Sequence, residues 1–293
     1  MRFVLPPLLA LAALPGCCLC GPGLPPRAHP LDPEAAIRTV PVQAGALWVP
    51  PAVGERWVYA ATWNGIPMGT AALEAVDLRQ VQGRQALHVA ATAQLSAGLR
   101  LFYHLKDEVA TDLDVETGLP LRFTKHIEEG KRLKDEYIVF DHAGKVSTYY
   151  RQDTGDGETS FTPIRAVYVP EGVHDALSCL FRARALALKE GREEVIRVTT
   201  DEKTYDTRLT ALGRETVTLD AFGALKAIRL GPSLEYEGVL PNKGRMRLWV
   251  EEGTRIPLVV EVEIKIGTVR VELIAREGAA EPFTPAPPEL PKP

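Results

Sequence analysis

The chain has 293 residues, of which 45% are hydrophobic and 25% are charged, and its formal net charge is −4. This balance is typical of a globular protein, and the length suffices for one large core or two modest ones. Charges of both signs are scattered and no basic block occurs, so the sequence lacks the electrostatic footprint of a nucleic-acid-binding protein.

The N-terminus predicts export. Residues 1–20, MRFVLPPLLALAALPGCCLC, combine one basic residue, an apolar run and small residues, which is the pattern of a signal peptide. The run is too short and too interrupted by proline to span a bilayer. Residues 14–17, LPGC, resemble a bacterial lipobox, in which Cys17 becomes the lipidated first residue. That resemblance implies a lipoprotein of the periplasm or outer membrane of a Gram-negative bacterium. Because Pro15 departs from the motif, plain signal cleavage is the alternative.

Composition then divides the chain. Residues 21–53 are rich in proline and glycine and predict a tether, residues 54–276 a single β-rich domain, and residues 277–293 an extended tail. Three of the four cysteines, including Cys17, cluster at the end of the signal, which leaves only Cys179 in the body. The body therefore has no disulfide framework and no cysteine metal site, and Cys179 is expected to be a small buried residue.

Within the body, apolar and polar residues alternate with a period of two. Segments 87–95, 205–211, 259–266 and 269–273 each place apolar side chains on one face and polar ones on the other. Turn signals such as Asn64-Gly65 separate roughly a dozen such segments. So many amphipathic strands predict a mainly β fold, a strongly curved antiparallel sheet that forms a half-open barrel.

One segment predicts a helix packed against or across this sheet. Residues 174–191, HDALSCLFRARALALKEG, begin with Asp175 as a possible N-cap and end at Gly191. Arg184 falls on the apolar stripe, and residues 182–188 also alternate, so a strand is the alternative. The preceding stretch, residues 153–163, is polar and glycine-rich and is expected to be a mobile loop.

A short phrase occurs twice. Residues 114–124 read DVETGLPLRFT and residues 249–260 read WVEEGTRIPLVV. In each, an acidic residue precedes a Gly/Thr turn, and proline enters the next strand, where it removes only one hydrogen-bond donor. Each copy therefore predicts a hairpin. Two similar hairpins fit either one broad meander of long strands or an internal duplication.

Four segments together carry a wider resemblance: GERWVYAATWNGIPMGTAALE, VETGLPLRFTKHIEEGKRLKDEYIVFD, LGRETV and LWVEEGTRIPLVVEVEIKIGTVRVEL. They resemble an exported bacterial family known as domain of unknown function 3108, over roughly residues 54–275. The hairpins are also similar in architecture to periplasmic lipoprotein carriers of the LolA and LolB type. Those carriers are half-barrels that hold acyl chains in an apolar cavity, so this resemblance is an analogy of fold.

The sequence contains no motif for catalysis, cofactor binding or metal binding. It lacks a nucleophile elbow, a phosphate-binding loop, a dinucleotide fingerprint and a zinc-protease motif. The six histidines show no metal-ligand spacing, and His104 and His126 are expected on the polar sides of strands. Carboxylates cluster in residues 107–116, but a solvated strand face is the simpler interpretation of that cluster than a hydrolase pair.

The more informative residues lie on apolar strand faces. Lys125 shares such a face with Leu121, Phe123 and Ile127. Because a desolvated cation needs a partner, we interpret Lys125 as a cation at a cavity mouth that meets a ligand headgroup or carboxylate. The alternatives are an edge-strand residue, a snorkelling side chain, or a salt bridge to a neighbour such as Asp135.

Aromatic residues also lie on apolar strand faces, where they would either line a ligand cavity or fill a hydrophobic core. The candidate ligand-lining residues are Trp57, Tyr59, Trp63, Tyr103, Phe123 and Lys125. The leading hypothesis is a non-enzymatic envelope protein that binds or carries an apolar ligand, a lipid or an acyl chain, in a curved-sheet cavity. Membrane attachment would be through a lipid anchor. A structural or interaction module without a cavity is the alternative, and an envelope hydrolase is a third.

Overall fold

The computed structural model describes residues 48, 50–100, 105–129, 132–155, 158–186, 188–200, 202–234, 246–264 and 266–278. The predicted signal peptide, Cys17, most of the tether and tail, and Tyr103 lie outside these residues. The strands are β1 (Arg56–Trp63), β2 (Ile66–Val81), β3 (Arg84–Leu95), β4 (Leu105–Asp114), β5 (Pro120–Glu129), β6 (Arg132–Asp141), β7 (Val146–Gly155), β8 (Glu158–Tyr168), β9 (Glu193–Thr200), β10 (Lys203–Leu219), β11 (Gly223–Leu234), β12 (Met246–Glu251), β13 (Pro257–Ile264) and β14 (Gly267–Glu277). The helices are α1 (Ala97–Arg100) and α2 (Ser178–Arg184).

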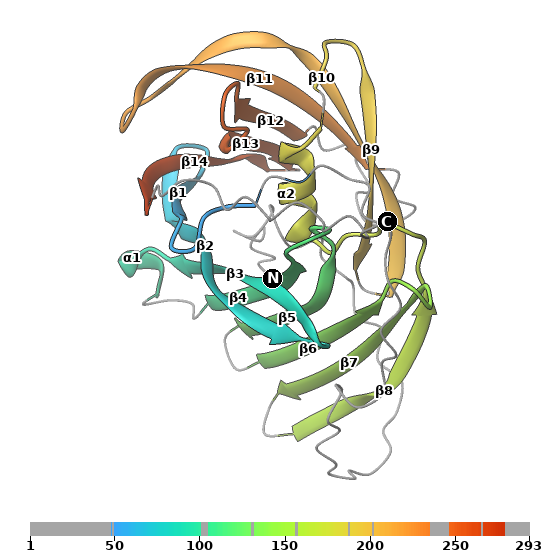
Figure 1. The fold of residues 1–293 in the computed structure, drawn as a ribbon. Helices are drawn as coiled ribbons and strands as arrows, with labels where there is room; N and C mark the ends of the chain where they lie inside the picture. Colours follow the sequence, from blue (N-terminus) through green and yellow to red (C-terminus); the bar gives the residue numbers. More distant parts are fainter. Residues whose placement is uncertain are drawn as a thin grey trace, which may run out of the picture.

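All fourteen strands belong to one sheet, in the order β8-β7-β6-β5-β4-β3-β2-β1-β14-β13-β12-β11-β10-β9. Every neighbouring pair is antiparallel, and the pair of β1 with β14 joins the two ends of the domain's sequence. The sheet curves strongly but does not close, because the edge strands β8 and β9 do not pair with each other (Figure 1). The predicted mainly β fold with a curved antiparallel sheet is confirmed.

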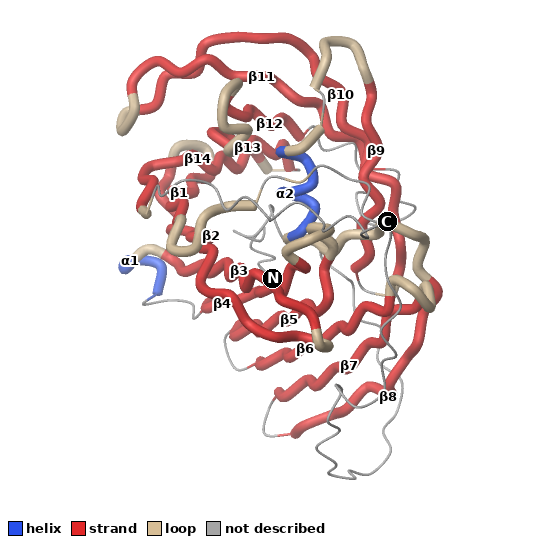
Figure 2. The backbone as a smooth tube through the Cα atoms, viewed as in Figure 1, coloured by secondary structure: helices blue, strands red, loops and turns tan. Residues whose placement is uncertain are grey.

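Helix α2 lies within the curve of the sheet, where strands surround it (Figure 2). We call the side of the sheet that faces α2 the inner face and the opposite side the outer face. Phe181 of α2 lies 6.0 Å, between ring centroids, from Trp57 of β1. The apolar side chains of the inner face and α2 form one continuous hydrophobic cluster, which includes Leu87, Val89, Ile138 and Phe140. Burial of this alternating set on one face is what holds each strand in register.

The helix is shorter than the sequence predicted. The N-cap residue is Leu177, and Asp175 caps the turn that leads into the helix, because its carboxylate accepts the amides of Leu177 and Ser178, both at 2.7 Å. The chain leaves the helical conformation after Arg184, and Leu186 and Leu188 are buried without a helix. Contacts with the sheet explain this, since Glu190 forms a bridge to Ala211 of β10.

The prediction of a mobile loop over residues 153–163 is wrong. Residues 153–155 end β7 and residues 158–163 begin β8, and Gly155 pairs with Glu158. Polar side chains support the pairing, because the hydroxyls of Thr154 and Thr159 lie 3.0 Å apart. A cross-strand threonine pair of this kind helps a polar sequence to form strands.

The two copies of the recurring phrase form the same turn, at residues 114–120 between β4 and β5 and at residues 251–257 between β12 and β13. In each copy the amide of the acidic residue donates to the carbonyl before the proline at 2.9 Å. In each, the threonine hydroxyl also accepts an amide at 3.3 Å. Gly118 and Arg255 occupy the same place, with φ of 70° and 61°.

This likeness extends over six strands, β1–β6 and β9–β14. The second strands, β2 and β10, have 16 and 17 residues. Each contains a bulge, beside Ala75 and Ala211. Before the first strand of each set, Gly54 and Gly191 donate to the carbonyls of these same alanines at 2.7 and 2.9 Å. The described residues therefore contain two structural repeats, which supports the internal duplication that the sequence left open.

Candidate functional site

Two of the predicted ligand-lining residues are buried on the inner face of β1. Trp57 is 2% exposed, and the guanidinium carbon of Arg184 lies 5.1 Å from its ring centroid. Tyr59 is 5% exposed, and its hydroxyl donates to the carbonyl of Pro257 at 3.2 Å. Burial raises the pKa of the Tyr59 phenol. Trp57 thus contacts α2 directly, and Tyr59 is buried on the same face of β1.

The remaining predicted aromatic residues lie farther along the inner face. Phe123 is 2% exposed and belongs to the main hydrophobic cluster. Trp63 is partly buried, packs against the same cluster, and donates its indole N–H to the carbonyl of Ile266 at 2.9 Å. The structure therefore places Trp57, Tyr59, Trp63 and Phe123 on one apolar surface. Their contact with a ligand stays a prediction.

Lys125 is a charged residue that the structure buries on the inner face. It is only 7% exposed, and it lies on the inner face two residues beyond Phe123. Strand β5 pairs with both β4 and β6, so Lys125 is not an edge-strand residue. Asp135 lies on the outer face and contacts His126 at 2.6 Å, so the alternative of a salt bridge from Lys125 to Asp135 is wrong. Among the described residues, no hydrogen bond or ion pair engages the Lys125 ammonium group.

Further charged side chains surround Lys125 on the inner face. The cross-strand register runs from Val109 through Lys125 and Glu136 to Arg151. We call the whole group the inner charge band; its members are Asp107, Lys125, Lys134, Glu136, Arg151 and Asp153. Asp107 is 4% exposed and Glu136 is 5% exposed. Beside the band, the next row of the inner face holds Phe123, Ile138 and Tyr149. The inner face thus changes from apolar to charged within one row.

The band contains ion pairs of its own. The ammonium of Lys134 lies 3.7 Å from a carboxylate oxygen of Glu136, and Arg151 bonds to Asp153 at 2.9 Å. Of this group, only Lys125 was predicted from the sequence as a site residue. The sequence placed Asp107 in a carboxylate cluster expected on a solvated strand face, and that expectation is wrong for Asp107, Asp112 and Asp114, which are at most 4% exposed. The signal for Lys134 and Glu136 was present, because both have the same parity as the buried Ile138 and Phe140. Only the register between β4, β5, β6 and β7 brings the six residues together.

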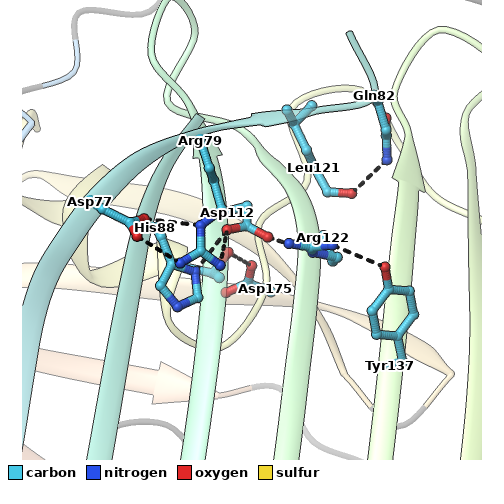
Figure 3. Close-up of polar contacts among 10 residues, drawn as sticks. Asp77, Arg79, Gln82, His88, Asp112, Leu121, Arg122, Tyr137 and Asp175 are labelled. Carbon is cyan, nitrogen blue, oxygen red and sulfur yellow. Dashed lines mark hydrogen bonds and ion pairs between the residues drawn. The ribbon is translucent and has the colours of Figure 1, made fainter. Parts of the chain in front are cut away.

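A second polar cluster lies on the outer face (Figure 3). The buried carboxylate of Asp112 contacts Nδ1 of His88 at 2.7 Å and Nε of Arg122 at 2.5 Å. Arg122 also reaches the hydroxyl of Tyr137 at 3.4 Å. Burial alone would raise the pKa of Asp112. The hydrogen bond from His88 and the charge of Arg122 outweigh that effect, so the pKa lies below its ordinary value.

This outer cluster is a cross-strand ion network that joins β3, β4, β5 and β6. An Asp–His pair activates catalysis when the histidine also meets a nucleophile. Within the part of the chain that the structure describes, His88 has no hydrogen bond to a hydroxyl or thiol.

Two other kinds of site were sought in all the residues that the structure describes. These residues contain no group of three or more His, Cys, Asp or Glu side chains that could hold a metal ion. Neither of the two described helices has the length and apolar character of a membrane span.

Three solved structures resemble the fold at low similarity. A β-barrel-like protein of DUF1849 from Brucella abortus has a TM-score of 0.42 and 11% identity, covering 78% of this chain and 98% of its own. A Bacteroides fragilis protein described as exported, with a YmcC-like fold, has a TM-score of 0.37 and 8% identity, covering 80% and 100%. A Parabacteroides distasonis protein described as a lipoprotein has a TM-score of 0.32 and 8% identity, covering 79% and 99%.

No curated protein matches the chain. A family match covers residues 58–274, from β1 to β14, which includes both repeats, α2 and the inner charge band. The expectation drawn from the distributed motifs is therefore confirmed over nearly the whole folded body. The chain belongs to the family described as protein of unknown function DUF3108.

Proposed function

We propose that this protein is an exported envelope protein that binds or carries an apolar ligand, a lipid or acyl chain, on the inner face of its curved sheet. The proposed role is binding without chemical change of the ligand. The signal-like N-terminus supports export, and Cys17 is the proposed site of a lipid anchor.

One observation carries this proposal: the inner face changes within a single row from buried apolar side chains to the inner charge band. Three members of the band, Asp107, Lys125 and Glu136, are buried. A core that served only to fold would gain nothing from these buried charges, because they must be desolvated. An amphiphile has the complementary form, with an apolar chain beside a polar headgroup. Burial of its chain would contribute about 25 cal/mol for each Å² removed from water.

Native mass spectrometry of the full chain, purified from the envelope of its source organism, tests the proposal. We expect a discrete added mass of one lipid molecule per protein, which is lost when the protein is denatured. A lipid attached covalently at Cys17 would survive denaturation, so the two are distinguished. A protein that carries no dissociable lipid, and takes up none from added vesicles, would instead be an envelope module without a ligand.

A further inference from the structure

We propose that the ammonium group of Lys125 binds the anionic headgroup, a carboxylate or phosphate, of the ligand. This inference rests on the proposed function and names the class of ligand. The other cations of the inner charge band already have partners, since Lys134 contacts Glu136 and Arg151 contacts Asp153. Lys125 is 7% exposed and has no hydrogen bond or ion pair among the described residues.

The internal repeat shows that the fold does not require this charge. Lys125 lies five residues after Pro120, and the equivalent residue after Pro257 is Val262. Across the strand pair, Lys125 faces Glu136, whereas Val262 faces Val269.

The first repeat therefore has a charged residue, Lys125, at the position where the second repeat has the apolar Val262. Val262 packs against the hydrophobic cluster, and Val269 is 5% exposed within it. In the second repeat, an apolar cross-strand pair at this position is sufficient for the strands to pair and pack. In the first repeat, two charged residues, Lys125 and Glu136, lie opposite each other at this position. Folding alone does not explain them, since buried charges are unfavourable unless they are compensated.

The surroundings of Lys125 fit an amphiphile with an acidic head. Phe123 and Ile138 form the adjacent apolar row, and both are at most 2% exposed. Because other residues of the hydrophobic cluster cover this row in the absence of a ligand, a bound chain would have to displace them, and its terminal anion would then lie next to the ammonium. A charge-assisted hydrogen bond is among the stronger kinds. Its loss should weaken binding by about 10- to 100-fold.

Displacement of a fluorescent naphthylamine probe from the full chain measures this effect. The competitors are dodecanoic acid, dodecyl phosphate and uncharged dodecan-1-ol. We expect both anions to bind about 10- to 100-fold more tightly than the alcohol. Of the two anions, the tighter binder identifies the headgroup. The Lys125→Met variant should lose this preference and still bind the alcohol.

Two further variants separate charge from fold. Lys226→Met removes an exposed cation from β11 and should leave all three affinities unchanged. Lys125→Val combined with Glu136→Val copies the second repeat, so it should fold with an unchanged or higher Tm and show no anion preference. Equal binding of acid and alcohol by the wild type would overturn the role of Lys125 while leaving the proposed function intact. Failure of all three competitors, together with the absence of co-purified lipid, would reject the proposed function itself.

Discussion

Replacement of Asp175 by alanine should lower the free energy of unfolding by about 3 to 5 kcal/mol. Asp175 is fully buried, and its carboxylate accepts the hydroxyl of Thr111 at 2.6 Å as well as the amides of Leu177 and Ser178. The substitution removes the link between β4 and the start of α2 and leaves three buried donors without an acceptor. Urea unfolding followed by circular dichroism measures the loss.

Asp175→Asn is the matched control, because it keeps an acceptor and removes the ionisable group. Burial raises the pKa of Asp175 from 3.8 to about 6 in the folded protein. A raised folded-state pKa means that the folded state holds the proton more tightly. The stabilisation is fully present below pH 4 and is lost as the pH rises through 6. The stability of the wild type relative to Asp175→Asn should therefore fall by about 3 kcal/mol across this window. A difference that does not vary with pH would show that Asp175 ionises normally.

Replacement of Phe181 by alanine should lower the free energy of unfolding by about 3 to 5 kcal/mol. The side chain is 1% exposed, and it is the aromatic contact between α2 and Trp57. Its removal leaves a cavity between the helix and β1, where the strands cannot collapse because both neighbours of β1 are paired to it. Thermal and urea unfolding both report the change.

Leu180→Ala serves as the comparison for Phe181→Ala, since Leu180 is on the same helix but only partly buried. It should have the smaller effect of the two. Equal effects would indicate that the helix contributes through its overall presence and not through the contact of Phe181 with Trp57. A loss of less than about 1 kcal/mol for Phe181→Ala would mean that α2 is not part of the stable core.

The strands could be predicted from the sequence because each half-buried strand carries its own signal. Leu87, Val89 and Ala91 alternate with polar residues, and this local pattern is sufficient to place them on one face. The hairpins at Gly118 and Arg255 could also be predicted, because the residues that form each turn are close together in the sequence. Long-range pairing was not predictable in this way. The contact of β1 with β14 joins residues more than 200 positions apart, such as Tyr59 and Leu273, and no local pattern specifies it.

The candidate site was predictable only in part for the same reason. Lys125 stood out because it interrupts an apolar face within its own strand. Glu136 and Arg151 each lie in a different strand, so their association with Lys125 depends on the register. Arg184 is the opposite case. It interrupts the apolar stripe of the predicted helix, but its guanidinium lies over the ring of Trp57. A planar cation can be buried against an aromatic face, which hydrophobic periodicity does not register.

Photo-crosslinking tests the central claim, a ligand on the inner face, most directly. The full chain would be irradiated with a dodecanoic acid that carries a diazirine in its chain, and the modified residues would be identified by peptide mass spectrometry. We expect adducts on inner-face residues of β4–β7, in the rows of Phe123 and Lys125, and we expect excess dodecanoic acid to suppress them. Adducts confined to outer-face residues such as His88 and Tyr137, or adducts that excess acid does not suppress, would contradict it.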